Sequence, residues 1–85
     1  MLEVIEKALA LIEEVLKKYQ GQQIPRNERK TIERIMELVV NSLFNEEYLE
    51  EAGEMRNLLR DLIEEKRIIS REDLLKIHKI KRRVV

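Results

Sequence analysis

Apolar residues recur every three or four positions along residues 2–20, which is the pattern of a helix that buries one face. A second apolar stripe, Val4, Ala8, Leu11 and Val15, runs beside the first. At about 100° per residue the two stripes cover about half of the helix circumference, which predicts at least two neighbouring helices. The first stripe, interpreted as core or as a self-association face, comprises Leu2, Ile5, Leu9, Ile12, Leu16 and Tyr19.

A second helix is predicted over residues 28–44, which repeat the broad apolar face. The intervening residues 21–26 read GQQIPR and form the clearest loop of the chain. Gly21 is expected to stop the first helix, because glycine readily adopts the left-handed conformation found after a helix C-terminus. Asn27 is the predicted N-cap of the second helix, and Pro25 lies near the helix start, where its missing N–H costs least.

The chain is predicted to break at Asn45 and to continue as a third helix over residues 46–66. Asn45 is a favourable N-cap residue, and Phe44 and Leu49 have the spacing of a hydrophobic staple around it. Gly53 lies inside this helix, but the apolar stripe continues in phase across it. We therefore expect a continuous helix with a close helix crossing at Gly53.

A fourth, shorter helix is predicted over residues 71–82, followed by a tail at residues 83–85. Ser70 and Asp73 have the spacing of a capping box at the start of this helix. The whole chain, residues 1–85, is therefore interpreted as a single all-α domain. It is predicted to be a small four-helix bundle with three long helices and a shorter C-terminal one, whose short connections favour antiparallel neighbours.

Charged residues make up 40% of the chain, with two Gly and one Pro, a composition of long helices that leans toward a thermophilic source. With no Cys and one His, the chain is predicted to hold no disulfide, metal or other cofactor. The absence of a long apolar run and of a basic leader predicts a soluble, cytoplasmic protein. Because a chain of 85 residues buries a small core, we predict self-association, with a homodimer favoured.

The net charge of zero hides an asymmetry. Residues 1–73 hold 17 acids and 12 bases, whereas residues 74–85 hold five bases and no acid. Cations at a helix C-terminus are favoured by the helix dipole without any ligand, which is the first interpretation. A basic face could also neutralise nucleic-acid phosphates or dock on an acidic protein surface. Lys76, Lys79 and Arg83 are predicted to share that face, and the full set of candidate contact residues is Lys76, Lys79, Lys81, Arg82 and Arg83.

Candidate catalytic side chains are scarce, so no enzymatic activity is predicted. His78 lies at the edge of an apolar face and is interpreted as a boundary residue with a helix neighbour, in preference to a ligand or a base. Paired acids such as Glu13–Glu14 and Glu50–Glu51 are interpreted as solvated, because they fall mostly on outward faces. The leading interpretation is a non-enzymatic helical module for protein interaction or oligomerisation. The alternative is a nucleic-acid-binding accessory or regulatory protein that uses the basic C-terminal helix.

Overall fold

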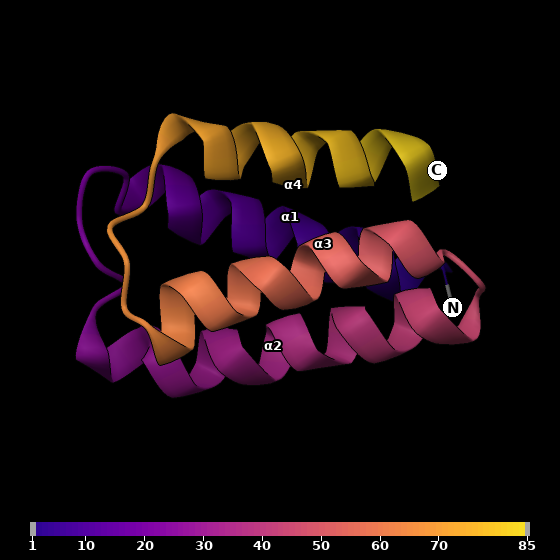
Figure 1. The fold of residues 1–85 in the computed structure, drawn as a ribbon, viewed down its shortest axis with the longest axis horizontal. Coiled ribbons are helices and arrows are strands. Elements are labelled where there is room, and N and C mark those ends of the chain that lie inside the picture. The colour runs from indigo at the N-terminus through magenta and orange to yellow at the C-terminus, as the bar shows by residue number, and fades with distance from the viewer. Residues whose placement is uncertain (1, 85) are drawn as a thin grey trace.

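The computed structural model describes residues 2–84 and arranges them as four antiparallel helices joined by short connections (Figure 1). The helices are α1 (Leu2–Lys18), α2 (Arg26–Asn45), α3 (Leu49–Leu59) and α4 (Arg71–Val84), and α3 continues into a π-helical turn, η1 (Arg60–Glu64). No strand occurs within residues 2–84. The predicted all-α four-helix bundle is confirmed, and α4 is the shortest helix once η1 is counted with α3.

Each helix packs against two neighbours, so that α1 contacts α2 and α4, and α3 contacts the same two helices. The prediction that the first helix touches at least two neighbours is therefore confirmed. All four helices and the connecting loops contribute to one core. Its fully buried large side chains are Ile5, Leu9, Ile12, Leu16, Ile24, Met36, Leu43, Met55, Leu58, Leu62, Ile69 and Ile77.

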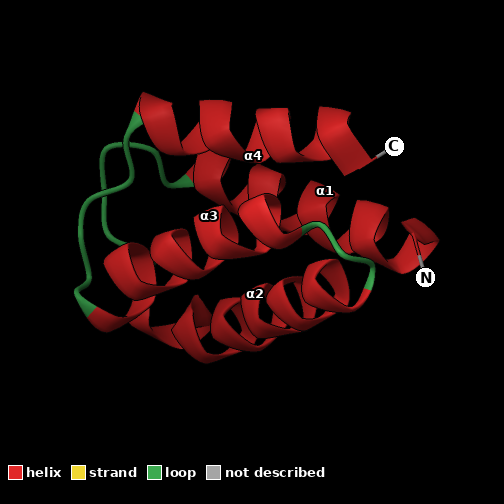
Figure 2. Ribbon diagram, turned by 45° about the vertical axis from the view of Figure 1, so that its right-hand side comes forward, coloured by secondary structure: helices red, strands yellow, loops and turns green. Residues whose placement is uncertain are grey.

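The α1–α2 and α3–α4 connections lie at the same end of the bundle (Figure 2) and hydrogen bond to each other. The Gly21 N–H donates to the Ile69 carbonyl oxygen, and the Ile69 N–H donates to the Gln22 carbonyl oxygen, both at 2.9 Å. Gly21 has a φ of 86°, a conformation that glycine adopts without steric cost. The prediction that Gly21 stops the first helix is not confirmed, because α1 already ends at Lys18 and Gly21 instead turns the chain within the loop.

The start of α2 corrects one prediction. Pro25 occupies the N-cap position and Arg26 is the first helical residue, so Asn27 lies inside the first turn and is not the cap. Pro25 has a φ of −57°, close to the value that its ring fixes, and the N–H that it lacks would have no partner within the helix. The backbone N–H of Glu28 donates to the Pro25 carbonyl oxygen at 3.0 Å, which closes the first turn.

The α2–α3 turn also differs from the prediction. Asn45 is the last residue of α2, and α3 begins after Tyr48 with no side-chain cap. The chain reverses through Glu47, whose φ of 66° lies in the left-handed region. Because Asn45 caps no helix, Phe44 and Leu49 do not form a buried staple around it, and both side chains are exposed.

Gly53 lies inside α3, so the predicted continuity of this helix is confirmed. The predicted close crossing is wrong, because a Cβ atom added at Gly53 would meet no atom within 4 Å. The residue is exposed on the outer surface of the bundle. The lack of a side chain at Gly53 therefore leaves open space on the surface, and no neighbouring helix packs closely against this position.

The ends of the last two helices lie near their predicted positions. The third helical segment ends with η1 at Glu64, two residues before the predicted end. The fourth helix begins at Arg71 as predicted, but it continues to Val84, which is buried against the core. The predicted tail at residues 83–85 is therefore helical in its first two positions, while Val85, like Met1, lies outside the described residues.

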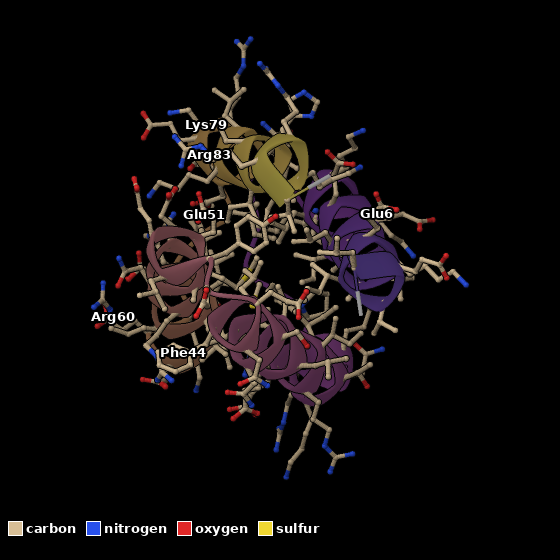
Figure 3. The ribbon with its side chains drawn as sticks, turned by 90° about the vertical axis from the view of Figure 1, so that its right-hand side faces the viewer. Glu6, Phe44, Glu51, Arg60, Lys79 and Arg83 are labelled. Carbon is tan, nitrogen blue, oxygen red and sulfur yellow. The ribbon has the colours of Figure 1, made fainter. Side chains whose placement is uncertain are left out.

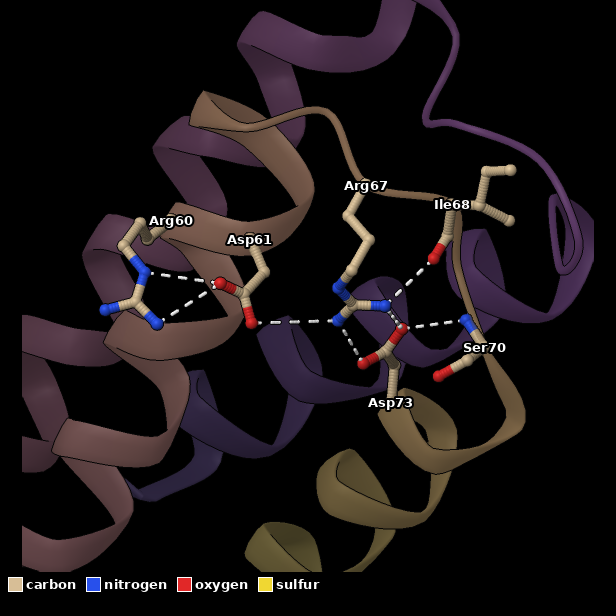
Figure 4. Close-up of polar contacts among 6 residues, drawn as sticks. All are labelled: Arg60, Asp61, Arg67, Ile68, Ser70 and Asp73. Carbon is tan, nitrogen blue, oxygen red and sulfur yellow. Dashed lines mark hydrogen bonds and ion pairs between the residues drawn. The ribbon is translucent and has the colours of Figure 1, made fainter.

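The start of α4 is held by the buried carboxylate of Asp73 (Figure 4), which is 1% exposed. It accepts hydrogen bonds from the Ser70 N–H at 2.8 Å and from the Arg67 guanidinium at 2.7 and 3.1 Å. Burial opposes ionisation of Asp73, but the hydrogen bonds from Arg67 and Ser70 outweigh it and lower the pKa. The hydrogen bond to Asp73 in turn raises the pKa of Arg67. Of the predicted capping pair, it is the Asp73 carboxylate that forms the cap, by accepting a hydrogen bond from the backbone N–H of Ser70.

Candidate interaction surfaces

The structure divides the five predicted basic contact residues into two groups. Lys81 and Arg83 bind acids of neighbouring helices within the same chain. The Lys81 Nζ lies 3.1 Å from the Glu13 Oε1 of α1. The Arg83 Nη1 lies 3.1 Å from the Glu54 Oε1 and 3.4 Å from the Glu51 Oε2, both on α3 (Figure 3). These two cations therefore tie the C-terminal half of α4 to the bundle.

The same contacts correct the interpretation of the paired acids. Glu13 and Glu51 are not simply solvated, because each faces α4 and accepts one of its cations. Glu51 is among the few buried charged side chains in the described part of the chain. The signal available in the sequence was the charge asymmetry itself, since the excess of acids over residues 1–73 supplies partners for the bases of the final helix.

Lys76, Lys79 and Arg82 belong to the second group and are exposed on the solvent side of α4. Together with Glu72, Leu75 and His78 they line a shallow depression, which we call the outer α4 face. Figure 3 shows Lys79 extending from α4 on the outside of the bundle. The grouping of Lys76, Lys79 and Arg83 on one binding face stays a prediction, but the Arg83 guanidinium is already engaged by the acids of α3.

Two features of the outer α4 face are not basic. Leu75 is 53% exposed near its centre, which is a large apolar side chain to leave in water. His78 is covered on one side, where its Nδ1 lies 3.9 Å from the Glu13 Oε2. Glu13 thus contacts both His78 and Lys81, and the expectation of a helix neighbour for His78 is confirmed.

The predicted self-association stripe of α1 lies mainly inside the bundle. Ile5, Leu9, Ile12 and Leu16 are buried by the other helices of the same chain. Leu2 remains partly exposed at the start of the helix, and Tyr19 packs at the edge of the core. The stripe is therefore core, and a second copy could reach its central residues only if the bundle opened. The prediction for Leu9 and Ile12, which allowed core or interface, resolves as core.

A groove between α2 and α3 is the surface that the sequence did not predict. Its end next to the α2–α3 turn is lined by Val40, Asn41, Phe44, Leu49, Ala52, Gly53 and Arg56. Phe44 is 63% exposed and Leu49 is 60% exposed, the highest values among the large apolar side chains exposed in the described chain. Gly53 keeps the space between them open, because it places no side chain there.

The groove continues along the same two helices and changes character. Its second half is lined by Glu33, Glu37, Leu59 and Glu64, while Val40, Asn41 and Arg56 belong to both halves. We call the whole surface the α2–α3 groove, with an apolar half at the turn and an acidic half beyond it. No clear signal for this surface is present in the sequence, because adjacent apolar residues elsewhere in the chain, such as Val39 and Val40, are both buried.

Neither surface resembles a metal site or a membrane-spanning element. No group of three His, Cys, Asp or Glu side chains within residues 2–84 is placed to hold a metal ion. Among the described helices, none combines the length and apolar character that a bilayer crossing requires. Comparison of the chain with protein-family models, curated proteins and solved structures yields no match.

Proposed function

We propose that the chain is a non-enzymatic helical interaction module that self-associates, and that the α2–α3 groove is its contact surface. The observation that supports this function is the position of Phe44 and Leu49, two exposed apolar side chains that flank the open space above Gly53. Single exposed apolar residues are common on soluble proteins, whereas apolar residues that converge on one concave surface indicate a contact site. Phe44 has the size and rigidity of an anchor residue at the centre of such a contact.

The chemistry of the groove also favours binding over catalysis. Its lining residues are apolar apart from Asn41, Arg56 and three glutamates, and they include no Ser, Cys, His or Tyr. A nucleophile paired with a base, the usual constellation of acyl transfer, has no candidates there. The groove therefore offers area and charge to a partner surface.

The test is the mass of the chain in solution at micromolar concentration, measured by light scattering and by sedimentation. The wild type should form a dimer or a larger assembly, and the double change Phe44→Ser, Leu49→Ser should reduce it to a monomer. Ile68→Ser is the matched control, because Ile68 is 55% exposed but lies in the α3–α4 connection, outside the groove. A monomeric wild type, or equal effects of the control and the groove changes, would refute the proposal.

A second candidate function is nucleic-acid binding through the outer α4 face. The observation that favours it is the outward position of Lys76, Lys79 and Arg82. Three phosphate contacts on duplex DNA would give a salt slope of roughly 0.9 per contact, with little sequence preference because phosphate contacts carry no sequence information. A mobility shift at low salt that disappears in Lys76→Ala, Lys79→Ala, Arg82→Ala would support this function, and no shift with DNA or RNA would eliminate it.

A further inference from the structure

We infer that the partner surface of the α2–α3 groove is the outer α4 face of a second copy, so that copies associate head to tail. This inference rests on the proposed function, in which the groove is a contact surface. It adds the identity of the occupant and the geometry of the assembly. Both surfaces are present on every copy, and each leaves large apolar side chains exposed, Phe44 and Leu49 in the groove and Leu75 on the outer α4 face.

The two surfaces are complementary in apolar character and in charge. The groove has an apolar half and an acidic half, in which Glu33, Glu37 and Glu64 outnumber the single cation Arg56. The outer α4 face carries one exposed apolar residue, Leu75, surrounded by three cations and a single acid, Glu72. An apolar centre with charges of opposite sign around it both buries area and fixes the orientation of a contact.

The spacing of the charges along the two helices also agrees. Lys79 and Arg82 lie four and seven residues after Leu75, or about 6 and 10 Å along α4. Glu37 and Glu33 lie three and seven residues before Val40, or about 5 and 10 Å along α2. If Leu75 is level with Val40 and the two helices are antiparallel, each cation therefore lies beside an acid.

The positions of the two surfaces on one copy determine how an assembly grows. Figure 3 shows Lys79 on α4 at one side of the bundle and Phe44 at the far side, beyond α3. A copy therefore cannot fill its own groove. Because the contact joins two different patches, a joined pair leaves one groove and one α4 face free, and further copies extend it to a closed ring or an open chain. A symmetric dimer formed by two grooves would leave no groove free and would not grow further.

The experiment uses one variant for each surface, Leu49→Asp in the groove and Leu75→Asp on the outer α4 face. Both residues are exposed, so the helical fold should survive, which circular dichroism checks. Each variant alone should be monomeric. An equimolar mixture should form a complex of two chains and nothing larger, because the Leu75→Asp copy offers an intact groove to the intact α4 face of the Leu49→Asp copy. The mass is measured by sedimentation.

The outcomes separate this inference from the proposed function. If Leu49→Asp is monomeric while Leu75→Asp still self-associates, the α4 face is not the partner surface, and the groove remains a contact. If both variants are monomeric and their mixture forms no complex, head-to-tail pairing is also wrong. If the wild type itself is monomeric, both proposals fail. A wild type that stays monomeric alone but binds duplex DNA through the same face would replace them with the nucleic-acid function.

A charge exchange tests the helix register within the assembly. Lys79→Glu should weaken association a few-fold, since it removes an exposed ion pair and adds repulsion. The double variant Lys79→Glu, Glu37→Lys should restore affinity, because the pair reappears with its signs exchanged. Lys7→Glu is the control, since Lys7 is exposed on α1 and lines neither surface, so its change should leave affinity unaltered. Equal weakening by Lys79→Glu and Lys7→Glu, or no recovery in the double variant, would overturn the pairing of Lys79 with Glu37.

Discussion

The α3–α4 junction and the α2–α3 turn both reverse the chain between antiparallel helices, but they treat their side chains in opposite ways. At the α3–α4 junction, Ile69 is buried, and the Asp73 carboxylate is fully hydrogen bonded to Arg67 and Ser70. At the α2–α3 turn, the following helix has no side-chain cap, and Phe44 and Leu49 remain in water. One junction uses its residues to stabilise the fold, whereas the other leaves apolar surface that the fold does not need.

The largest expected effect compares one apolar residue from each junction. Ile69→Ala should lower the free energy of unfolding by about 2–5 kcal/mol, because it removes a fully buried side chain and leaves a cavity. Leu49→Ala should change it by less than about 0.5 kcal/mol, because the side chain is mostly in water. Urea denaturation measures both, at protein concentrations low enough to keep the chain monomeric. A large loss in Leu49→Ala would mean that the turn is part of the fold's stability.

The same contrast explains what the sequence could predict. Residues such as Leu9, Ile12 and Leu16 repeat in phase over four turns of helix, and burial of such a stripe is the main driving force of folding. The helices, the fold class and much of the core therefore followed from periodicity. The caps at Asn27 and Asn45 were wrong because α2 starts after Pro25 and α3 after Tyr48 with no side-chain cap at either, and a cap worth about 1 kcal/mol does not decide where a helix begins.

The surfaces could not be predicted from periodicity, because they depend on which helices are neighbours. From the sequence, Lys81 and Arg83 were candidate contacts for a partner. In the structure, the packing of the helices places Glu13 beside Lys81 and Glu54 beside Arg83. From the sequence, Gly53 was expected to contact another helix. In the structure, α3 packs against α2 and α4, and Gly53 lies on its outer side, where no atom comes close. The first α1 stripe was a candidate face for a second copy, but α2 and α4 of the same chain cover its central residues, while Val4 and Leu11 of the second stripe stay exposed.

The second prediction concerns the polar half of the α3–α4 junction. Asp73→Ala should destabilise the fold by about 1–3 kcal/mol, because the Ser70 N–H and the Arg67 guanidinium lose their acceptor. The value lies below that for a fully buried ion pair, since the Arg67 side chain is 39% exposed and can return to water. Ser70→Ala is the control: it keeps the backbone N–H that Asp73 binds, so it should cost less. If Ser70→Ala lowered the free energy of unfolding as much as Asp73→Ala does, the serine hydroxyl would have to act as the cap.

The lowered pKa of Asp73 gives this contribution a definite pH dependence. The folded-state pKa lies below the ordinary value of 3.8, so the carboxylate stabilises the fold fully above that value. The contribution is lost as the pH falls from there through the lowered folded-state pKa. The stability difference between the wild type and Asp73→Asn should therefore shrink in acid, as measured by urea denaturation at several pH values. A difference that stays constant across this range would contradict the ion pair.

The third prediction separates stability from binding at the α2–α3 groove. Gly53→Ala should stabilise the isolated chain by about 0.5–1 kcal/mol, because alanine favours a helix and its Cβ meets no neighbouring atom. The same methyl group lies on the groove lining and should weaken self-association. Denaturation of the monomer and sedimentation of the assembly measure the two effects. Stabilisation with unchanged association would mean that the space above Gly53 is not part of the contact.

The smallest expected effect concerns the basic residues of α4, which divide between fold and surface as the two junctions do. Lys81 is bound to Glu13 across α4 and α1, and a double-mutant cycle of Lys81→Met with Glu13→Gln should give a coupling of about 0.2–1 kcal/mol that decreases at high salt. Lys79→Met should change monomer stability by less than about 0.5 kcal/mol, since this residue lies on the outer α4 face. Lys79→Met should instead weaken association, which Lys81→Met should leave nearly unchanged. If the two lysines affected stability and association alike, the basic run would act only as unspecific charge near the end of a helix.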